Sequence, residues 1–343
     1  MQFVEDLFTF LDESYIPERL PFRDNQIIVI KEKIEKYAKN LRPTNLLIFG
    51  GSGLGKTACV KYVFKNFQPH RIKYVYINSF IHNSLNSLLI KIAEELKIGI
   101  TFKGLSNEEI LEKIMTHSKN NNIKLVICID EIDKLKDLNE FLYTFSRSTS
   151  FFDYSPYLIL ISNSKDFILQ LDKRVLSSFV FDDLEFKPYT FEQLKIIAEE
   201  RIKPIFKNNY DKAAITLIAN LAYNNGSDVR VILRIIRKAL EIIIDENKDK
   251  LSLEIVKKVV KNFESKIEKI NEVKIDERQK EILEILKSGE KYTSEIFEEI
   301  SKKFGIKKRT FNYLMEDLAK KGLIEIKRVK GIKGSKFIAK LKL

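Results

Sequence analysis

The chain has 343 residues, of which 44% are apolar and 31% charged, with 12 glycines and 7 prolines. This composition excludes a disordered or collagen-like chain, and the length exceeds what one hydrophobic core usually organises, so we expect two or three domains. Most of the formal net charge of +12 lies in residues 301–343, which hold 14 Lys/Arg and 3 Asp/Glu, whereas residues 1–300 are almost neutral.

This local excess of positive charge predicts a module that binds a polyanion, with nucleic acid favoured over an anionic membrane surface. A general richness in lysine, as in AT-biased or thermophilic proteomes, is the alternative. Cys59 and Cys128 lie in apolar runs and are too few for a disulfide framework, which predicts an intracellular protein. No uncharged apolar stretch approaches about 18 residues, and the start M-Q-F-V-E-D-L-F is acidic, so we expect a soluble, unprocessed chain.

Residues 1–188 alternate short apolar runs with helical patterns, which is typical of βα units around a buried parallel sheet. We expect strands at 46–49, 74–77, 125–129 and 158–161, and helices at 25–40, 58–67, 84–97 and 106–119. Every segment from about 191 to 263 has helical period, which predicts an all-helical second domain, expected at 189–268. Its helices are expected at 191–206, 211–224, 228–244 and 252–263.

A charged link near 264–275 precedes a third domain, expected at 273–343. Three helices are expected at 277–288, 293–304 and 308–321, and two strands at 323–327 and 337–341 around a glycine-containing turn. Three helices followed by a hairpin predict a winged helix-turn-helix.

The most specific motif follows the first predicted strand. It has the form G-x-x-x-x-G-K-T between a strand and a helix, so its backbone N–H groups are expected to cradle phosphates, with Lys56 on the β and γ oxygens and Thr57 on Mg²⁺. The predicted nucleotide contacts of this loop are Gly50, Gly51, Ser52, Gly53, Leu54, Gly55, Lys56, Thr57 and Ala58.

Two carboxylates, Asp130 and Glu131, end another apolar strand at the same predicted sheet edge. We expect Asp130 to hold Mg²⁺ through water and Glu131 to orient the water that attacks the γ-phosphate. A buried strand can also end in acids for no catalytic reason, but beside the phosphate loop the pair favours nucleotide hydrolysis.

Three further polar side chains are candidates for phosphate chemistry. Asn163 ends the strand at 158–161 and could position the attacking water or detect the γ-phosphate, or could simply form a turn. Arg174 and Arg230 could neutralise transition-state charge in phosphoryl transfer, and their spacing is equally compatible with surface salt bridges.

Several segments together resemble the archaeal origin-recognition-type replication initiators, which are AAA+ ATPases. The first is Y-I-P-E-R-L-P-F-R-D-N-Q-I at residues 15–27, and it is more specific than the phosphate loop or the D-E-I-D of 130–133. The other matches, in order, are I-S-N at 161–163, residues 171–178, P-Y-T-F-E-Q-L at 188–194 and G-S-D-V-R at 226–230. The resemblance implies an α/β fold: an AAA+ P-loop parallel-sheet domain, an all-helical lid and a C-terminal winged helix.

The resemblance also implies roles for individual residues. Asn163 would be the first sensor, Arg230 the second sensor on the lid, and Arg174 an arginine finger offered to a neighbouring protomer. Tyr189 and Arg201 would be additional nucleotide contacts.

Two more positions follow from the resemblance. Arg23 and its flanking segment would line the adenine pocket. Residues 138–154 would correspond to an initiator-specific insertion that grips DNA, with Arg147 as its contact, although an ordinary surface helix would give the same pattern.

The predicted recognition helix buries Phe311, Leu314, Met315 and Leu318, which leaves a polar face toward its N-terminal end. Its expected DNA contacts are Lys307, Lys308, Arg309, Asn312 and Tyr313, and those of the wing are Lys327, Arg328, Lys330, Lys333 and Lys336. The wing tip has lysine where the family usually has arginine, so we expect strongly salt-dependent DNA binding with limited sequence selectivity.

These features predict an ATP-dependent DNA replication initiator, cytoplasmic and chromosome-associated, in which slow ATP hydrolysis acts as a conformational switch. Its cofactors would be ATP and Mg²⁺, and its partners duplex origin DNA, the replicative helicase and a second copy or paralogue, with no membrane. A winged-helix signal-transducing ATPase that regulates transcription is the alternative, although such regulators usually add a sensing or repeat domain. A clamp-loader subunit would instead end in a helical collar. The three histidines, at 70, 82 and 117, have no metal-ligand spacing.

Overall fold

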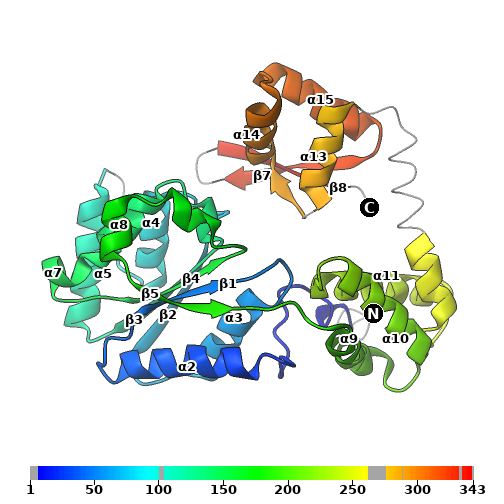
Figure 1. The fold of residues 1–343 in the computed structure, drawn as a ribbon, viewed down its shortest axis with the longest axis horizontal. Helices are drawn as coiled ribbons and strands as arrows, with labels where there is room; N and C mark the ends of the chain where they lie inside the picture. The colour runs from blue at the N-terminus through cyan, green and yellow to red at the C-terminus, as the bar shows by residue number, and fades with distance from the viewer. Residues whose placement is uncertain (1–6, 100–103, 262–275, 288, 332–333, 342–343) are drawn as a thin grey trace. The chain divides into compact units, whose positions relative to one another are not determined.

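The computed structural model describes residues 7–99, 104–261, 276–287, 289–331 and 334–341 (Figure 1). Two compact units divide the chain, Met1–Val256 and Lys257–Leu343. The first contains the predicted sheet domain and most of the predicted helical domain, and the second contains the predicted winged helix. In the part of the chain that the structure describes, no helix is long and apolar enough to cross a membrane.

A five-stranded parallel sheet with strand order β2-β3-β4-β1-β5 forms the first half of unit 1–256. The order brings β1 and β3 to either side of β4, so the loops that follow these three strands meet at one edge. The strands are β1 (Asn45–Phe49), β2 (Ile72–Asn78), β3 (Lys124–Asp130), β4 (Tyr157–Ser162) and β5 (Phe181–Glu185).

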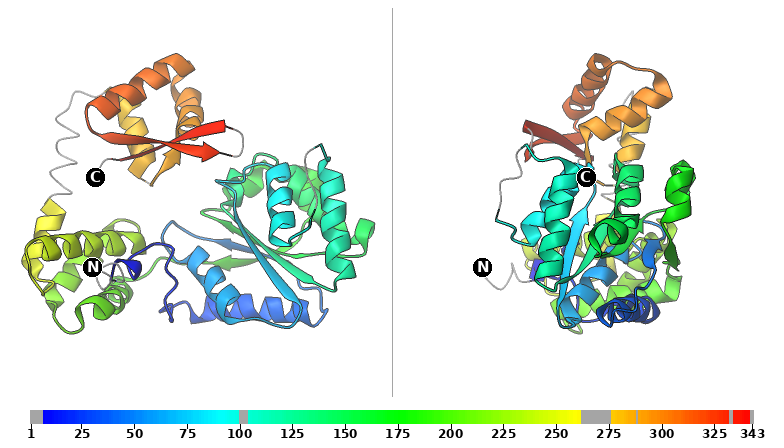
Figure 2. Two further views of the ribbon diagram at one scale, coloured as in Figure 1. Left: turned by 180° about the vertical axis from the view of Figure 1, so that it is seen from behind. Right: turned by 90° about the vertical axis from the view of Figure 1, so that its left-hand side faces the viewer.

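Helices cover both faces of this sheet (Figures 1 and 2). On one face, Leu125 and Ile127 pack into the core formed with the covering helices. Because β3 is buried on both faces, its sequence is an almost continuous apolar run. The helices of this half are α2 (Asp24–Ala38), α3 (Lys56–Asn66), α4 (Leu85–Glu95), α5 (Asn107–Asn120), α6 (Leu138–Ser146), α7 (Ser148–Phe152) and α8 (Lys173–Ser178), with 3-10 turns η1 (Ile132–Lys134) and η2 (Asp166–Gln170).

The strand β5 is absent from the sequence prediction. Its sequence F-D-D-L-E has no apolar run, because β5 is the edge strand next to β1 and its aspartates Asp182 and Asp183 are exposed. The pairing of this edge with β1 is a tertiary feature that hydrophobic periodicity does not register.

A bundle of helices completes unit 1–256 and agrees closely with the expected periodicity. Helix α9 begins with a capping box in which Thr190 and Gln193 satisfy each other's backbone N–H groups, and α11 begins at the N-cap Asp228. The helices are α9 (Phe191–Phe206), α10 (Lys212–Asn224) and α11 (Val229–Asp245), followed by helical residues 253–261.

Unit 257–343 has the helices and hairpin of a winged helix, packed as a three-stranded antiparallel sheet, β6-β8-β7, against three helices. Ile282, Ile300 and Phe311 are fully buried where the helices meet. The elements are α13 (Glu277–Lys287), β6 (Lys291–Tyr292), α14 (Thr293–Phe304), α15 (Lys308–Lys320), β7 (Ile324–Gly331) and β8 (Gly334–Leu341). The predicted charged link at 264–275 lies outside the described residues.

One polar network lies in this otherwise apolar core. The amide of Gln279 is buried and donates to Asp317 Oδ2 over 2.7 Å, which joins α13 to α15. Asp276 Oδ1 accepts from the Gln279 backbone N–H and thereby caps α13, while Lys321 forms an ion pair with Asp317. This network fixes the two helices at one relative position.

Candidate nucleotide site and nucleic-acid interface

The loop between β1 and α3 has the conformation of a phosphate-binding loop. Gly55 is in the left-handed region at φ 85° and is the N-cap of α3, which begins at Lys56, two residues before the predicted start. A Cβ at Gly50 would lie 2.4 Å from the carbonyl oxygen of Phe186, so only glycine fits there. The turn directs the N-terminus of α3 into the loop, where an anion is favoured by the free N–H groups.

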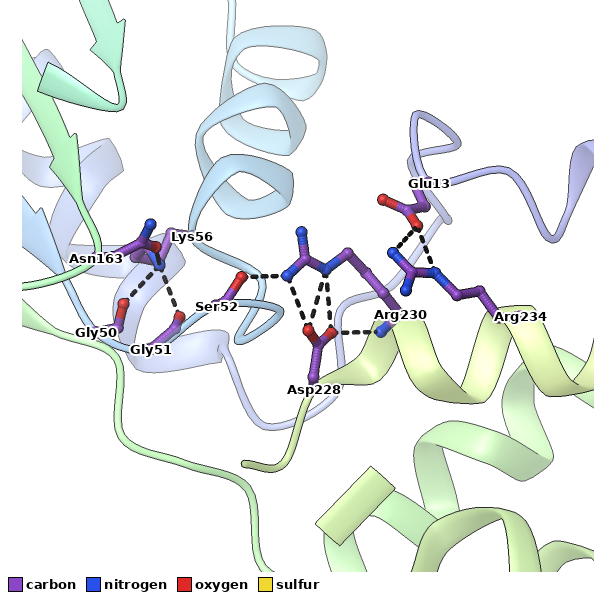
Figure 3. A network of polar contacts seen from close by, with 9 residues as sticks. All are labelled: Glu13, Gly50, Gly51, Ser52, Lys56, Asn163, Asp228, Arg230 and Arg234. Carbon is purple, nitrogen blue, oxygen red and sulfur yellow. Dashed lines mark hydrogen bonds and ion pairs between the residues drawn. The ribbon is translucent and has the colours of Figure 1, made fainter. Parts of the chain in front are cut away.

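Lys56 is buried within this loop (Figure 3). Its ammonium donates to the carbonyl oxygens of Gly50 and Gly51 over 2.6 and 2.7 Å, and to Asn163 Oδ1 over 3.0 Å. Burial lowers the pKa of Lys56 to about 8, in spite of the negative charge of Asp130. The two predicted site residues at 56 and 163 therefore meet, and a bound polyphosphate would supply the countercharge that this ammonium lacks.

Asp130 at the end of β3 lies against the first turn of α3. Its Oδ2 accepts hydrogen bonds from the hydroxyls of Thr57 and Tyr76, each over 2.6 Å. A hydroxyl and a carboxylate oxygen side by side are ligands of the hard type that Mg²⁺ prefers, with water and phosphate completing the shell. The described residues contain no group of three or more His, Cys, Asp or Glu that could hold a metal ion.

Glu131 follows in a left-handed backbone conformation, at φ 55°. Burial raises the pKa of Glu131 to about 7, and the neighbouring carboxylates Asp130 and Asp133 act in the same direction. Asp133 is itself held by the Ser162 hydroxyl at 2.9 Å. A carboxylate with a pKa near 7 beside the metal-type ligands suits a general base.

The N-terminus of α11 contacts the phosphate loop directly (Figure 3). Arg230 donates to Ser52 Oγ and forms an ion pair with Asp228 at 2.8 Å, and the Val229 N–H donates to the carbonyl of Gly53 over 3.2 Å. We call these five residues, Ser52, Gly53, Asp228, Val229 and Arg230, the lid–loop junction. It brings the predicted second-sensor arginine to the phosphate site.

Arg23 is buried and joins three segments of the chain. Its guanidinium donates to the carbonyl oxygens of Leu54 and Lys187, each over 3.0 Å, and lies 3.8 Å from the ring centroid of Tyr189. The burial that this packing imposes raises the pKa of Tyr189 to about 12, against the opposing charge of Arg23. Arg23 therefore supports the phosphate loop through main-chain contacts.

The segment that flanks Arg23 lines a cavity. Tyr15 and Ile16 contribute to a cavity of about 520 Å³ whose other lining residues include Lys65 at the end of α3 and Arg237 on α11, and Arg23 is absent from its lining. Arg201 lies nearby, with its guanidinium 5.8 Å from the centroid of Tyr15 and 3.4 Å from the carbonyl of Phe10.

The recognition-helix candidate α15 exposes the polar face that the sequence predicts. Lys307, Arg309, Asn312 and Tyr313 are exposed, Tyr313 by 68%. Lys308 is exposed as well, but its ammonium lies 4.3 Å from the centroid of the Phe297 ring and 5.1 Å from that of Phe311, and desolvation lowers its pKa. A cation–π contact of this kind holds Lys308 against the domain, so its charge is less available to a partner than those of its neighbours.

The predicted wing is the hairpin of β7 and β8. Lys327 and Arg328 are exposed, and Lys327 lies 3.5 Å from Glu325. Lys330 and Lys336 belong to the two strands, with their side chains outside the described part of the structure, and Lys333 lies outside the described residues.

Comparison with known proteins finds relatives of one kind. A family model described as an AAA domain matches residues 40–162. The ORC1-type DNA replication protein 1 of Archaeoglobus fulgidus is 31% identical over 264 residues, covering 74% of this chain and 64% of that protein. That of Methanothermobacter thermautotrophicus is 28% identical over 343 residues, covering 93% and 88%. The structure of the Aeropyrum pernix ORC1 protein in complex with DNA matches with a TM-score of 0.68 at 25% identity, covering 98% of this chain and 93% of that chain.

The chain is similar to the ORC1-type DNA replication proteins over most of its length. Its fold is accordingly an AAA+ domain with a C-terminal winged helix, as the sequence predicts. In the alignments with the A. fulgidus and Sulfolobus acidocaldarius ORC1-type proteins, the chain spans 64% and 61% of their length.

Two residues that the resemblance to ORC1-type proteins singles out lie on the surface. Arg174 is exposed on α8, and in the described part of the chain it has no ion-pair partner. Arg147 is exposed at the end of α6, 4.8 Å from the ring centroid of Tyr143. Helix α6 itself buries Phe141, Leu142 and Phe145 in the core, so this face of the helix is not available as a contact surface.

Sequence reasoning missed two members of the candidate nucleotide site. Tyr76 reaches Asp130 because β2 is paired with β3, with Tyr76 beside Cys128. Asp228 lay inside the G-S-D-V-R motif, and its position as an N-cap was the available signal. No local pattern indicated that its carboxylate also binds Arg230.

Proposed function

We propose that this chain is an ATP-dependent DNA replication initiator that binds duplex origin DNA through its winged helix and through the end of α6. The observation that carries the proposal is that one chain joins a phosphate-loop site, contacted by α11, to a winged helix whose C-terminal part, residues 301–343, is strongly basic. The domains would be 1–188, 189–268 and 273–343.

The nucleotide site has residues for each part of Mg²⁺–ATP. The loop N–H groups and Lys56 would hold the phosphates, and Thr57 and Asp130 would hold the metal, which neutralises charge on the β and γ oxygens. Glu131, with its raised pKa, would accept the proton of the attacking water, and Asn163 would orient that water. Tyr189 and Arg201 would complete the nucleotide contacts.

Hydrolysis would be slow in an isolated chain. Arg174 is exposed on α8 and makes no described contact with the chain's own site, which suits a residue offered to a neighbouring protomer, either a second copy or a paralogue. Without an arginine from a partner, phosphoryl transfer lacks a charge worth roughly 10³–10⁵ in rate. The ATPase would therefore act as a switch, in which Arg230 transmits the state of the nucleotide to the lid.

The DNA contacts would come from Lys307, Lys308, Arg309, Asn312 and Tyr313 at the start of α15, from the wing, and from Arg147. The exposed guanidinium of Arg309 and the amide of Asn312 are side chains that can read base edges, while the lysines contact phosphate. A chromosome-bound initiator of this kind would then recruit or load the replicative helicase.

The experiment that tests the proposal is fluorescence-anisotropy binding to duplex DNA from the chromosome's candidate origin and to a scrambled duplex. Each is measured with ATP, with ADP and without nucleotide at one salt concentration. We expect tighter binding to origin DNA that depends on nucleotide, and loss of that dependence in Lys56→Ala. Equal, purely salt-governed binding to both duplexes in every nucleotide state would refute the initiator.

A further inference from the structure

Asp228 takes up much of the hydrogen-bonding capacity of Arg230. Its Oδ1 accepts from the Arg230 backbone N–H over 2.8 Å and from Nε over 3.1 Å, and its Oδ2 accepts from Nη2 over 2.8 Å (Figure 3). The same Nη2 donates to Ser52 Oγ in the phosphate loop. The guanidinium that faces the phosphate site is thus already paired with a carboxylate of its own helix.

The carboxylate of Asp228 also lies directly against the phosphate loop. A Cβ built on Gly53 would be 1.7 Å from Asp228 Oδ1, so the loop and the carboxylate are in the closest contact that glycine permits. The side chains of Arg230 and Asp228 are 29% and 18% exposed, so the pair is only partly screened by solvent. A negative charge therefore lies at the edge of a site that would bind a polyphosphate.

Capping of α11 does not require this charge. Asp228 caps the helix through its contact with the Arg230 N–H, and asparagine and serine cap helices about as well as aspartate. What asparagine would remove is the negative charge opposite the guanidinium. Burial lowers the pKa of Arg230, but the hydrogen bond and charge of Asp228 outweigh this and leave the pKa above its ordinary value.

We propose that Asp228 is a specificity-determining residue, which competes with the terminal phosphate for Arg230 and so limits how strongly the chain prefers a nucleoside triphosphate to a diphosphate. This inference rests on the proposed function, in which Arg230 is the lid's contact with the terminal phosphate. A carboxylate and a phosphate are alternative anionic acceptors for the same guanidinium, so each contact kept by Asp228 is one that the phosphate must replace or share. A diphosphate lacks this terminal phosphate and therefore does not compete with Asp228 for Arg230.

The test uses the full chain with Mg²⁺, and measures the dissociation constants of ADP and of a slowly hydrolysed triphosphate analogue by titration calorimetry. In Asp228→Asn we expect the ratio of the ADP constant to the triphosphate constant to rise by about tenfold, the scale of one charge-assisted hydrogen bond. The rise should come from tighter triphosphate binding, with ADP binding nearly unchanged. Asp228→Ser keeps a capping oxygen, gives the same expectation and serves if the asparagine variant does not fold.

Two controls separate competition for Arg230 from a general effect on the lid. Asp211→Asn changes another lid aspartate that precedes a helix and is paired with a cation, Lys250 at 2.7 Å, and should leave the ratio unchanged. In a chain that already carries Arg230→Ala, the change Asp228→Asn should no longer alter the ratio, because the competing guanidinium is gone.

An unchanged or lowered ratio in the single variants would overturn the inference, as would an equal rise in the Arg230→Ala background. These outcomes differ from failure of the proposed function. If the unaltered chain bound neither nucleotide, the ATP-dependent initiator itself would be refuted, whereas a chain that binds both with an unmoved ratio refutes the role of Asp228 alone.

Discussion

At the scale of single residues, a buried guanidinium decides how the phosphate loop is supported. Arg23 satisfies the carbonyl oxygens of Leu54 and Lys187 and stacks on Tyr189, so it ties the loop to the segment that enters α9. A charged donor in a poorly solvated position is costly unless all such contacts are made at once. These contacts of Arg23 are present in the chain without nucleotide, so they contribute to its stability in that state.

Arg23→Ala should therefore lower the free energy of unfolding of the nucleotide-free chain by about 3 kcal/mol, because one buried and one partly buried carbonyl group lose their donor and the stacking on Tyr189 is lost. Arg23→Lys should recover only part of this, since an ammonium cannot span both carbonyls. Chemical denaturation measures the free energy of unfolding of both variants. Arg19→Ala, at an exposed arginine four residues earlier, is the control and should change stability by less than about 0.5 kcal/mol.

At the scale of elements, the close approach of α11 to the phosphate loop depends on one glycine. Gly53 has φ 68° and leaves no room for a Cβ beside Asp228, whereas a Cβ on Gly51 would make only an ordinary contact with Leu54, at 3.5 Å. Without nucleotide, Gly53→Ala should cost at least about 2 kcal/mol more than Gly51→Ala in denaturation, from backbone strain and displacement of the lid. Equal costs would mean that the lid–loop junction contributes nothing to stability.

A second prediction at this scale concerns the contact between α13 and α15, in which Gln279 donates to Asp317. Hydrogen bonds from Lys321 and Gln279 lower the pKa of Asp317, so the stability it contributes is present above its unfolded pKa of about 3.9 and is lost as the pH falls through the lower, folded value. Calorimetric unfolding should show Asp317→Asn less stable than the unaltered chain at pH 7. The difference should shrink below about pH 4 and approach zero; a difference independent of pH would contradict this origin.

At the scale of the whole molecule, the charge is divided unequally between the segments. Residues 301–343 account for almost all of the excess of Lys and Arg over Asp and Glu. If about 6–10 phosphates are contacted, affinity for duplex DNA should fall by roughly 10³–10⁵ between 50 and 200 mM salt. Single alanine changes at Lys307 and Arg309 should each lower the slope of log affinity against log salt by about 1.

Two further variants serve as comparisons in the same anisotropy titrations. Lys287→Ala removes a lysine of α13 that is paired with Glu284 and should leave the slope unchanged. Lys308→Ala should lower the slope less than Lys307→Ala, because its ammonium lies over Phe297 and Phe311. An equal loss at all four positions would indicate non-specific attraction to the whole unit rather than contact through α15.

Much of the fold could be predicted because its elements carry strong local signals. Helices α9 and α11 have clear apolar periodicity and side-chain caps, and β3 and β4 are buried on both faces, which makes them short apolar runs. The edge strand β5 lacks that signal, and the separation of α6 from α7 within 138–154 was not foreseen. Those features depend on neighbours that are distant in the sequence.

The sequence by itself determined the chemistry that is available: a glycine-rich loop that ends in Lys56 and Thr57, carboxylates after an apolar strand, and a basic segment after a helical domain. These are local patterns, in which residues close in sequence act together. Only the tertiary structure decided which side chains meet, because the order of parallel strands brings Asp130 to Thr57 and Tyr76, and the approach of α11 brings Arg230 to Ser52. It also decided that Arg230 is shared with Asp228, since that contact depends on the conformation of one helix end beside one glycine.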